Sequence, residues 1–167
     1  SADGTMVPLV VVRPGGAIPK GGMPTILEGY GGYGLSTATP VYRREFMAWG
    51  ARGGAMAYCG IRGGGERGRA WHEGGRGPNK PNGHADYIAC AETLKAKGYA
   101  PSNGVIATGT SMGGALVPPA VLKRPELFAG MIPRVAMLNT TRIGATNNGA
   151  NQFDEVGDPA TPEGFKA

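Results

Sequence analysis

The sequence predicts an α/β fold, in which a mostly parallel sheet carries helices on both faces. Its strand-like segments are apolar without the polar–apolar alternation typical of a sheet with one solvent face. Helix-like segments lie between them along the chain, as in parallel sheets. Clusters of glycine, which supplies 31 of the 167 residues, separate the two kinds of segment and so predict ordered loops rather than a disordered chain. The length is that of one domain.

Five apolar runs are the expected strands. They are short, and glycine or proline bounds most of them, as is typical of strands. Pro133 argues against a regular strand in the last run, because proline has no amide proton to donate to a sheet. The runs are residues 6–13 (MVPLVVVR), 24–28 (PTILE), 55–61 (AMAYCGI), 105–108 (VIAT) and 129–138 (AGMIPRVAML).

Three segments are the expected helices: residues 42–52, residues 84–97 and the stretch from Gly113 onward. The second has one apolar face, and Gly98 follows it as a stop signal. In the third, Pro118 and Pro119 each remove a helix hydrogen bond, at about 3 kcal/mol or more in a helix interior. This helix is therefore expected either to kink or to be short. After Asn139 the sequence becomes polar and loop-like.

Residues 62–82 are expected to form a long glycine-rich loop. They contain a literal G-x-G-x-x-G pattern at Gly63, Gly65 and Gly68, and Asp86 follows about twenty residues later, as in dinucleotide-binding sites. Such a site also needs a helix directly after the pattern. The stretch that follows, RAWHEGGRGPNKPNG, is too rich in glycine and proline to begin one, so no dinucleotide site is expected.

The net charge is +5, and much of the excess lies between Arg62 and Lys80. A basic, glycine-rich loop could contact RNA, but this one lacks the repeated RGG units and interleaved aromatics of disordered RNA binders. We therefore expect no nucleic-acid partner. A loop suited to an anionic group, such as a substrate carboxylate, is the better hypothesis, and a solvated basic surface is the alternative.

Several classes of site are disfavoured by what the sequence lacks. Cys59 and Cys90 are too few for a disulfide framework, and their apolar surroundings predict buried free thiols. No apolar run approaches the roughly 18 residues that span a bilayer, so no membrane association is expected. Without C-x-x-C or H-E-x-x-H, we expect neither a metal nor another cofactor.

The stretch GTSMGG at residues 109–114 joins an expected strand to an expected helix. It contains G-x-S-x-G in the context of a nucleophile elbow, namely strand, sharp turn and helix. Glycine flanks permit a strained serine backbone, because a Cβ on either neighbour would clash. The Ser111 hydroxyl would then stand clear of the sheet, and the Met112 N–H could bind a developing oxyanion. A tight turn without chemistry is the alternative.

A serine nucleophile of this kind needs an acid and a histidine base, which follow the serine along the chain. Both histidines, His72 and His84, precede Ser111. His72 is expected to form hydrogen bonds in a loop or in the core, and His84 to cap the start of a helix. The sequence therefore predicts that residues 1–167 lack their own general base.

Seven motifs follow one another along the chain: DGTMVP (3–8), PTILEGYGGYG (24–34), GIRGGGERGRAWHEGGR (60–76), NKPNGHADYIACAETL (79–94), GTSMGGAL (109–116), RPELF (124–128) and EVGDP (155–159). Together and in this order they resemble the prolyl oligopeptidase family of serine peptidases, in its catalytic domain. The resemblance covers nearly the whole chain. The tyrosine-glycine loop and the IRGGGE…WH run are its most specific parts.

The resemblance implies an α/β-hydrolase fold, which in this family is usually paired with a β-propeller that restricts access to small peptides. The family's nucleophile falls on Ser111. Its oxyanion hole combines the backbone N–H of Met112 with a tyrosine hydroxyl, here that of Tyr30, for which packing at a turn is the alternative. Tyr33 matches an aromatic residue that lines the substrate pocket. Glu155 could help to bind an amine or a basic side chain of the substrate.

The sequence departs from the prolyl-specific pattern at two positions. Met112 stands where prolyl-specific members have asparagine, and an ungapped count from Ser111 puts Gln152 where they have a tryptophan. That tryptophan stacks on the substrate proline, so strict cleavage after proline is not expected here. The EVGDP segment looks more like the broader group that includes oligopeptidases specific for basic residues.

The family's catalytic aspartate and histidine would both lie beyond Ala167, and its propeller mainly before Ser1. The chain begins SADGT and stops at GFKA, so both ends are expected to be cut from something longer. Residues 1–167 are thus interpreted as a partial α/β-hydrolase catalytic domain, incomplete at its C-terminal side and without the β-propeller. By itself this stretch is expected to be inactive or nearly so.

Three functions stay open at this point. The first is a serine-type oligopeptidase that hydrolyses short peptides through an acyl-enzyme on Ser111. The second is a non-catalytic α/β-hydrolase-like binding module, and the third is an esterase or acyl-peptide hydrolase on the same scaffold. The sequence predicts neither the substrate preference, nor the oligomeric state, nor the compartment, whether cytoplasmic or periplasmic.

Overall fold

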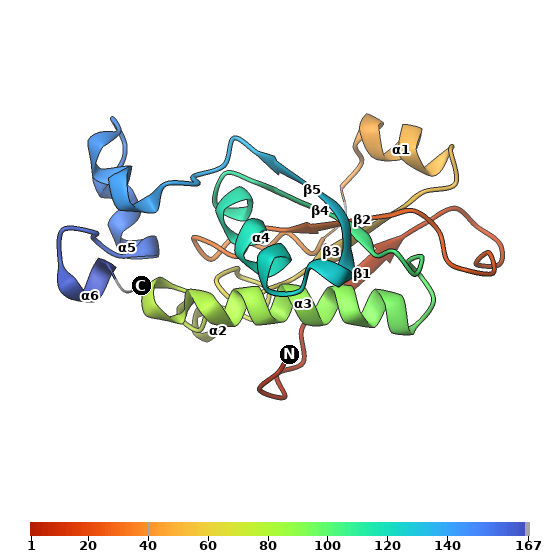
Figure 1. The fold of residues 1–167 in the computed structure, drawn as a ribbon, viewed down its shortest axis with the longest axis horizontal. Helices are drawn as coiled ribbons and strands as arrows, with labels where there is room; N and C mark the ends of the chain where they lie inside the picture. Colours follow the sequence, from red (N-terminus) through yellow and green to blue (C-terminus); the bar gives the residue numbers. More distant parts are fainter. Residues whose placement is uncertain (40, 166–167) are drawn as a thin grey trace.

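The computed structural model describes residues 1–39 and 41–165, and its centre is one five-stranded sheet (Figure 1). The strands lie in the order β1-β3-β2-β4-β5. β1 runs antiparallel to β3 and the other neighbours are parallel, which confirms the expected mostly parallel sheet. The strands are β1 (Leu9–Val12), β2 (Thr25–Gly29), β3 (Ala55–Cys59), β4 (Val105–Thr110) and β5 (Phe128–Arg134).

Helices lie on both sides of this sheet, as expected. α3 runs along one side and packs against α4, whereas α1 lies on the opposite side (Figure 1). None of the helices described is both long and apolar enough to cross a membrane. They are α1 (Arg44–Gly50), α2 (Arg69–Glu73), α3 (Lys80–Ala96), α4 (Met112–Lys123), α5 (Phe153–Val156) and α6 (Pro162–Phe165), with the 3-10 turns η1 (Gly77–Asn79), η2 (Pro125–Leu127), η3 (Thr140–Ala145) and η4 (Ala150–Gln152).

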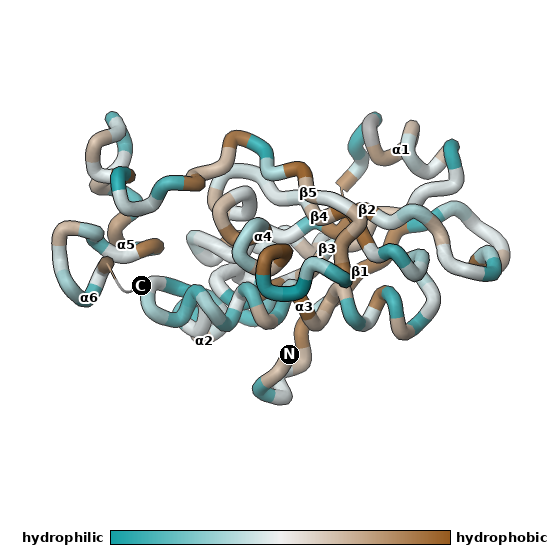
Figure 2. The backbone as a smooth tube through the Cα atoms, viewed as in Figure 1, coloured by the Kyte–Doolittle hydropathy of each residue, from teal (hydrophilic) through white to brown (hydrophobic). Residues whose placement is uncertain are grey.

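The main core lies between the sheet and the pair α3 and α4. Buried side chains of β2, β3 and β4 meet Tyr87, Leu94 and Leu116 there. The Tyr87 hydroxyl donates to the Leu27 carbonyl at 2.6 Å and accepts from the Thr108 N–H at 3.2 Å, so this buried polar group is satisfied. Burying each large apolar side chain contributes about 1.5–3 kcal/mol. Figure 2 shows hydrophobic stretches of the backbone gathered around β1 and β3.

The two cysteines form a disulfide, so the expectation of free thiols is wrong. Cys59 ends β3 and Cys90 lies in α3, and both side chains are buried. Their Cα atoms are 6.2 Å apart, within the range that a disulfide spans. The apolar setting of each cysteine is visible in the sequence. Their pairing depends on the packing of α3 across β3, which joins residues 31 positions apart.

We expect reduction of this disulfide to destabilise the domain. The bond links residues 31 positions apart, and the chain entropy that it removes from the unfolded state corresponds to about 3.7 kcal/mol for such a loop. Thermal unfolding of the full-length protein with and without a reductant measures the effect. In the variant Cys59→Ala/Cys90→Ala the reductant should no longer affect this domain. A non-reducing digest without the linked Cys59–Cys90 peptide would contradict the pairing.

The glycine-rich segment after β3 contains regular structure, so the expectation that residues 62–82 form one long loop is wrong. The segment holds α2 and η1, and α3 already begins at Lys80 rather than at His84, because Pro81 fits the first turn of a helix. Its glycines permit the close approach of two backbone segments. A Cβ on Gly63 would lie only 2.2 Å from the Gly31 carbonyl oxygen. Gly63 and Gly65 of the G-x-G-x-x-G pattern therefore serve chain packing, whereas a Cβ on Gly68 would meet no other atom. α2 begins at Arg69, directly after the pattern, so the expectation that no helix begins there is wrong.

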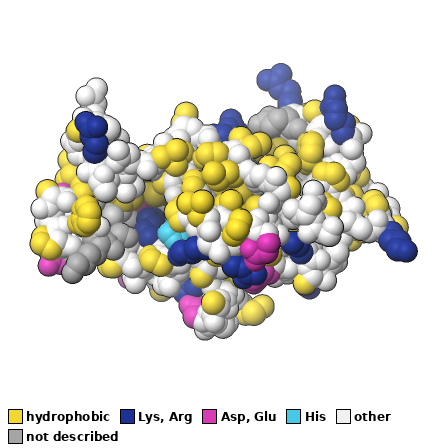
Figure 3. All heavy atoms as spheres, viewed as in Figure 1, with side chains coloured by type: hydrophobic (Ala, Val, Ile, Leu, Met, Phe, Trp, Pro, Cys, Tyr) yellow, Lys and Arg dark blue, Asp and Glu magenta, His cyan; other side chains and the backbone are white. Residues whose placement is uncertain are grey.

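α4 and β5 both keep prolines inside regular structure. α4 continues through Pro118 and Pro119 to Lys123, so this helix is not short. Pro133 pairs with Gly109 in β5, an edge strand, where a missing amide proton is tolerated. β5 ends at Arg134, earlier than expected. Figure 3 shows apolar side chains gathered on the face over α4 and β5. The exposed apolar residues of these elements include Leu122, Met131 and Ile132.

Candidate active site

Ser111 lies at the turn between β4 and α4, in a backbone conformation that few serines adopt. Its φ is 56° and its ψ is −114°, and side chains with a Cβ rarely occur at such a positive φ. The strain costs on the order of 1–3 kcal/mol and persists only where the surroundings hold it. Here the Ser111 N–H donates to the Arg134 carbonyl at 2.9 Å. The sharp strand-to-helix turn expected from GTSMGG is confirmed.

The glycines on both sides of Ser111 are required by close packing. A Cβ on Gly109 would lie 2.3 Å from the Gly113 carbonyl oxygen, and a Cβ on Gly113 would lie 2.3 Å from the Gly29 carbonyl oxygen. Gly29 ends β2, so the turn at Ser111 packs directly against the end of the neighbouring strand. A larger residue at either glycine would push the turn away from β2.

Met112 is the first residue of α4, and its side chain is buried. The first N–H groups of a helix have no acceptor within the helix, and the helix dipole adds positive potential at this end. The Met112 N–H is therefore a donor directly after Ser111. The side chain of Met112 packs on the tyrosine-glycine loop, because a Cβ on Gly32 would lie 2.6 Å from Met112 Cγ.

The tyrosine-glycine loop, residues 30–34, follows β2 at the same edge of the sheet as Ser111. The carboxyl ends of β2 and β4 meet there because these strands are parallel neighbours. A Cβ on Gly113 would lie 3.0 Å from the Tyr30 Cα, so the backbone of Tyr30 reaches the start of α4. The structure thus brings the loop that carries Tyr30 to the turn that carries Ser111 and Met112.

Tyr30 and Tyr33 lie near each other in this loop, with ring centroids 6.4 Å apart. Burial raises the pKa of both hydroxyls, and the nearby Glu155 carboxylate contributes to the same shift. Both tyrosines are therefore protonated at neutral pH and can donate. The Tyr33 hydroxyl donates to the side-chain carbonyl of Gln152, at the end of η4. Gln152 thus contacts the aromatic residue that is expected to line the substrate pocket.

Glu155 in α5 is 3% exposed, and both of its carboxylate oxygens have a basic partner within the chain. Oε1 lies 3.0 Å from Lys80 Nζ, and Oε2 lies 2.9 Å from His72 Nε2. Burial by itself would raise the pKa of Glu155, but the hydrogen bond from His72 and the charge of Lys80 outweigh it and lower that pKa. A role for Glu155 in binding a substrate amine stays a prediction, and the basic groups that it contacts are the chain's own.

The two histidines have different surroundings. His72 bonds to Glu155, which confirms the expectation of a hydrogen-bonding histidine. His84 lies inside α3 rather than at its start, so the expected capping role is wrong. Its Nδ1 is buried without a hydrogen-bond partner in the described structure, and burial, aided by nearby lysines, lowers its pKa to about 4. Within residues 1–39 and 41–165, neither histidine is hydrogen-bonded to Ser111.

The basic side chains that follow β3 are largely paired within the chain. Arg62 donates to Asp86 through Nε at 2.8 Å and Nη2 at 2.7 Å, and to Asp3 through Nη1 at 2.6 Å. Arg69 pairs with Glu73 at 2.7 Å. Asp86, at the position of a dinucleotide-binding acid in the sequence pattern, is therefore the partner of a buried arginine. Much of the positive charge that an anion would meet is already neutralised by the chain's own carboxylates.

Sequence reasoning missed one residue of this region, Lys80. It falls in the segment interpreted as a loop, and only the proline after it signals the start of a helix. Besides Glu155, Lys80 Nζ binds the Gly31 carbonyl at 3.1 Å and so reaches the tyrosine-glycine loop. The described part of the chain holds no group of three or more histidine, cysteine or acidic residues that could bind a metal ion.

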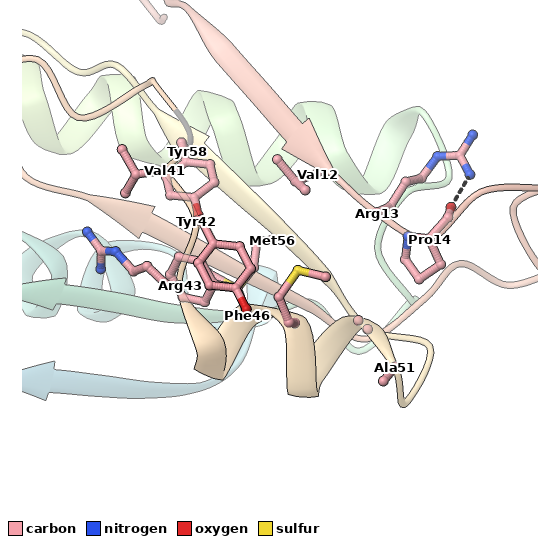
Figure 4. Close-up of a pocket in the computed structure, with 13 residues that line it drawn as sticks. Val12, Arg13, Pro14, Val41, Tyr42, Arg43, Phe46, Ala51, Met56 and Tyr58 are labelled. Atoms are coloured by element: carbon pink, nitrogen blue, oxygen red, sulfur yellow. Dashed lines mark hydrogen bonds between the residues drawn. The ribbon is translucent and has the colours of Figure 1, made fainter.

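A separate apolar cavity of about 580 Å³ lies between α1 and the β1–β3 end of the sheet (Figure 4). Phe46 of α1 meets Tyr58 of β3 edge-on there, with ring centroids 5.8 Å apart. Val12 and Met56 add to the lining. Neither Ser111 nor the tyrosine-glycine loop is among the residues that line it, so this cavity is not part of the candidate active site.

Known proteins resemble this chain along nearly all of it. Residues 40–167 match the Prolyl oligopeptidase family. Over 157 residues the chain is 37% identical to a prolyl endopeptidase of Elizabethkingia miricola. This match covers 94% of the chain and 22% of that protein. Over 167 residues it is 35% identical to a dual-function macrocyclase-peptidase of Galerina marginata. This match covers 99% of the chain and 23% of that protein. The chain thus spans less than a quarter of the length of these relatives.

Solved structures have the same fold. A structure from a study of two prolyl endopeptidases matches with a TM-score of 0.93 at 40% identity, over 99% of this chain and 24% of that one. Oligopeptidase B from Trypanosoma brucei matches with a TM-score of 0.86 at 35% identity, over 98% of this chain and 23% of that one. These likenesses confirm the expected α/β-hydrolase fold. The chain belongs to the prolyl oligopeptidase family of serine peptidases.

Proposed function

We propose that this chain is the nucleophile-bearing part of the catalytic domain of a serine oligopeptidase. The observation that carries the proposal is the backbone of Ser111, held at a φ of 56° between two glycines at a strand-to-helix turn. A side chain on such a turn projects from the sheet, where a substrate carbonyl can reach it. Relatives 37% and 36% identical to the chain are prolyl endopeptidases, which supports a peptide substrate.

In the proposed reaction, Ser111 Oγ attacks the carbonyl carbon of a short peptide. The C–N bond breaks, the amine leaves with a proton, and an acyl-enzyme ester stays on Ser111. Water then hydrolyses the ester, which releases the acid and restores the serine. The Met112 N–H and the Tyr30 hydroxyl would stabilise the negative oxygen of each tetrahedral intermediate. Support comes from the place of Met112 directly after Ser111 and from the packing of the Tyr30 backbone against the start of α4.

The proton of Ser111 needs a base, which we expect to lie outside residues 1–167. His72 is bound to Glu155, and His84 sits inside α3. The family resemblance places the histidine and the aspartate beyond Ala167. Residues 1–167 would then be nearly inactive by themselves, because removing triad members lowers rates by orders of magnitude.

The proposed substrate is a short peptide, cleaved without strict specificity for proline. Tyr33 donates to Gln152, so both residues bring polar atoms to a place where a proline ring would need an apolar stacking surface. The dual-function macrocyclase-peptidase and the prolyl endopeptidases are relatives of comparable identity. Their names support peptide chemistry as the shared activity.

Labelling of the full-length protein with a fluorophosphonate tests the proposal. We expect modification at Ser111 and its loss in Ser111→Ala, because the probe reacts with an activated serine. Ser102→Ala is the matched control, since Ser102 lies exposed in the turn before β4, and it should be labelled like the wild type. Equal labelling of the wild type and Ser111→Ala would end the proposal.

The two other functions predict different results. If Ser111 of the wild type is not labelled, the result favours the non-catalytic binding module. An esterase would be labelled but would hydrolyse acyl esters and leave matched peptides intact. Rates on the two matched substrate sets therefore separate the peptidase from the esterase.

A further inference from the structure

We propose that Glu155 is a positioning residue, which holds the tyrosine-glycine loop against the Ser111 turn through Lys80 and His72. The inference rests on the proposed function, because Tyr30 would donate to the oxyanion from this loop. It gives Glu155 a role inside the protein instead of a role in substrate binding. Its basis is a set of contacts that joins α5 to α2, to α3 and to the loop.

The loop has a conformation that needs support from outside. The φ angles are 62° at Gly31, 53° at Tyr33 and 63° at Gly34. Tyr33 has a Cβ and is therefore strained at this angle, so the loop keeps its shape only while its surroundings hold it. At its far end the Gly34 N–H donates to the Gly63 carbonyl at 3.1 Å. Support at the near end comes from a side chain.

That side chain is Lys80, which is 8% exposed. Its Nζ donates to the Gly31 carbonyl at 3.1 Å and to Glu155 Oε1 at 3.0 Å. Burial lowers the pKa of Lys80, and the charge of Glu155 counteracts that shift. Without a counter-charge, a buried ammonium group loses its proton or moves out of the interior to contact solvent. Lys80 therefore holds Gly31 as a charged donor because Glu155 lies beside it.

A second route leads from Glu155 to the other end of the loop. Glu155 Oε2 bonds to His72 Nε2 at 2.9 Å, and the His72 ring lies beside Gly34, where a Cβ would stand 3.5 Å from His72 Cγ. Glu155 Oε1 itself would be 3.6 Å from a Cβ on Gly32. Glu155 is 3% exposed and both of its oxygens already have a basic partner within the chain, so little of the carboxylate is open to a substrate amine. These contacts are those expected of a residue that supports the tyrosine-glycine loop.

Glu155→Gln in the full-length protein tests the inference, since it keeps the size of the side chain and removes its charge. We expect the amide hydrogen exchange of residues 30–34 to become about tenfold faster or more, because local opening becomes easier. Asp154→Asn is the matched control, because the Asp154 side chain is 97% exposed and next in sequence. It should leave the exchange unchanged. Unchanged exchange in Glu155→Gln would overturn the inference.

Catalysis provides the second readout. Per labelled active site, Glu155→Gln should lower kcat for a peptide by about 10–100-fold and change KM much less, because the oxyanion forms only in the transition state. In a Tyr30→Phe background the same change should cost less than about twofold, since the hydroxyl that it positions is gone. A kcat equal to that of the wild type, or losses that multiply, would overturn the inference.

Two further arrangements keep the test decisive. If Glu155→Gln does not fold, as judged by thermal unfolding, Lys80→Met takes its place, because it removes the bond to Gly31 and keeps the pair of Glu155 with His72. The same outcomes then apply. If Ser111 of the wild type is not labelled, the proposed function fails, whereas hydrogen exchange still decides whether Glu155 holds the loop.

Discussion

Replacing Ser111 with alanine in the full-length protein should lower kcat/KM for peptide hydrolysis by about four to six orders of magnitude. Oγ is the atom that forms the ester with the substrate, so the acyl-enzyme cannot form without it. Alanine keeps the Cβ, and the backbone strain at a φ of 56° is therefore the same in both proteins. Initial rates on a fluorogenic short peptide measure the loss, and the midpoint of thermal unfolding should be unchanged.

Ser102→Ala is again the control, and it should keep the rate of the wild type because Ser102 is exposed in a turn. A loss smaller than about tenfold in Ser111→Ala would contradict the assignment of the nucleophile, since an attacking oxygen has no substitute in alanine. A loss accompanied by a lower unfolding midpoint would instead indicate that Ser111 supports the turn, which is the structural alternative.

The turn at Ser111 could be predicted because its signals are local. Gly109 and Gly113 flank the serine, and the structure shows that a Cβ on either would come within 2.3 Å of a carbonyl oxygen. The strands were predictable for a similar reason, since continuous apolar runs are what a sheet covered on both faces requires. In both cases the residues that carry the pattern are the residues that make the structure.

The contacts that hold the site together join residues far apart, and the sequence carries no local sign of them. Glu155 lies 83 positions from His72 and 75 from Lys80, so its two partners become visible only when α2 and α3 are in place. Cys59 and Cys90 sit in apolar runs that suit free thiols equally well. The start of α3 was missed for another reason, because a proline breaks a helix interior but is tolerated in a first turn.

In Asp86→Ala we expect the free energy of unfolding to fall by about 3–5 kcal/mol. Asp86 is fully buried and accepts three hydrogen bonds from Arg62, from the backbone N–H at 2.9 Å, Nε at 2.8 Å and Nη2 at 2.7 Å. Without Asp86, the guanidinium group keeps Asp3 and Ser1 as partners, both near the start of the chain. Domains have a total stability of about 5–15 kcal/mol, so this is a large share.

Chemical denaturation of the full-length protein, followed at the transition of this domain, measures the effect. Glu73→Ala is the control, because the pair of Glu73 with Arg69 is exposed on α2 and screened by solvent, so no measurable change is expected. A loss in Asp86→Ala no larger than in Glu73→Ala would contradict the prediction.

A double substitution separates two contributions to the free energy of unfolding: the destabilisation by an unpaired buried charge and the net stabilisation by the Arg62–Asp86 ion pair. In Arg62→Met/Asp86→Leu both charges are gone, and apolar replacements of buried ion pairs often lose little stability, so most of the loss in Asp86→Ala should be recovered. Arg62 precedes Gly63, whose carbonyl accepts from Gly34 and whose Cα packs on the Gly31 carbonyl. If Asp86→Ala also lowers kcat, the ion pair and Glu155 hold the same loop from two sides. If it lowers stability alone, the loop depends on Glu155 and its partners.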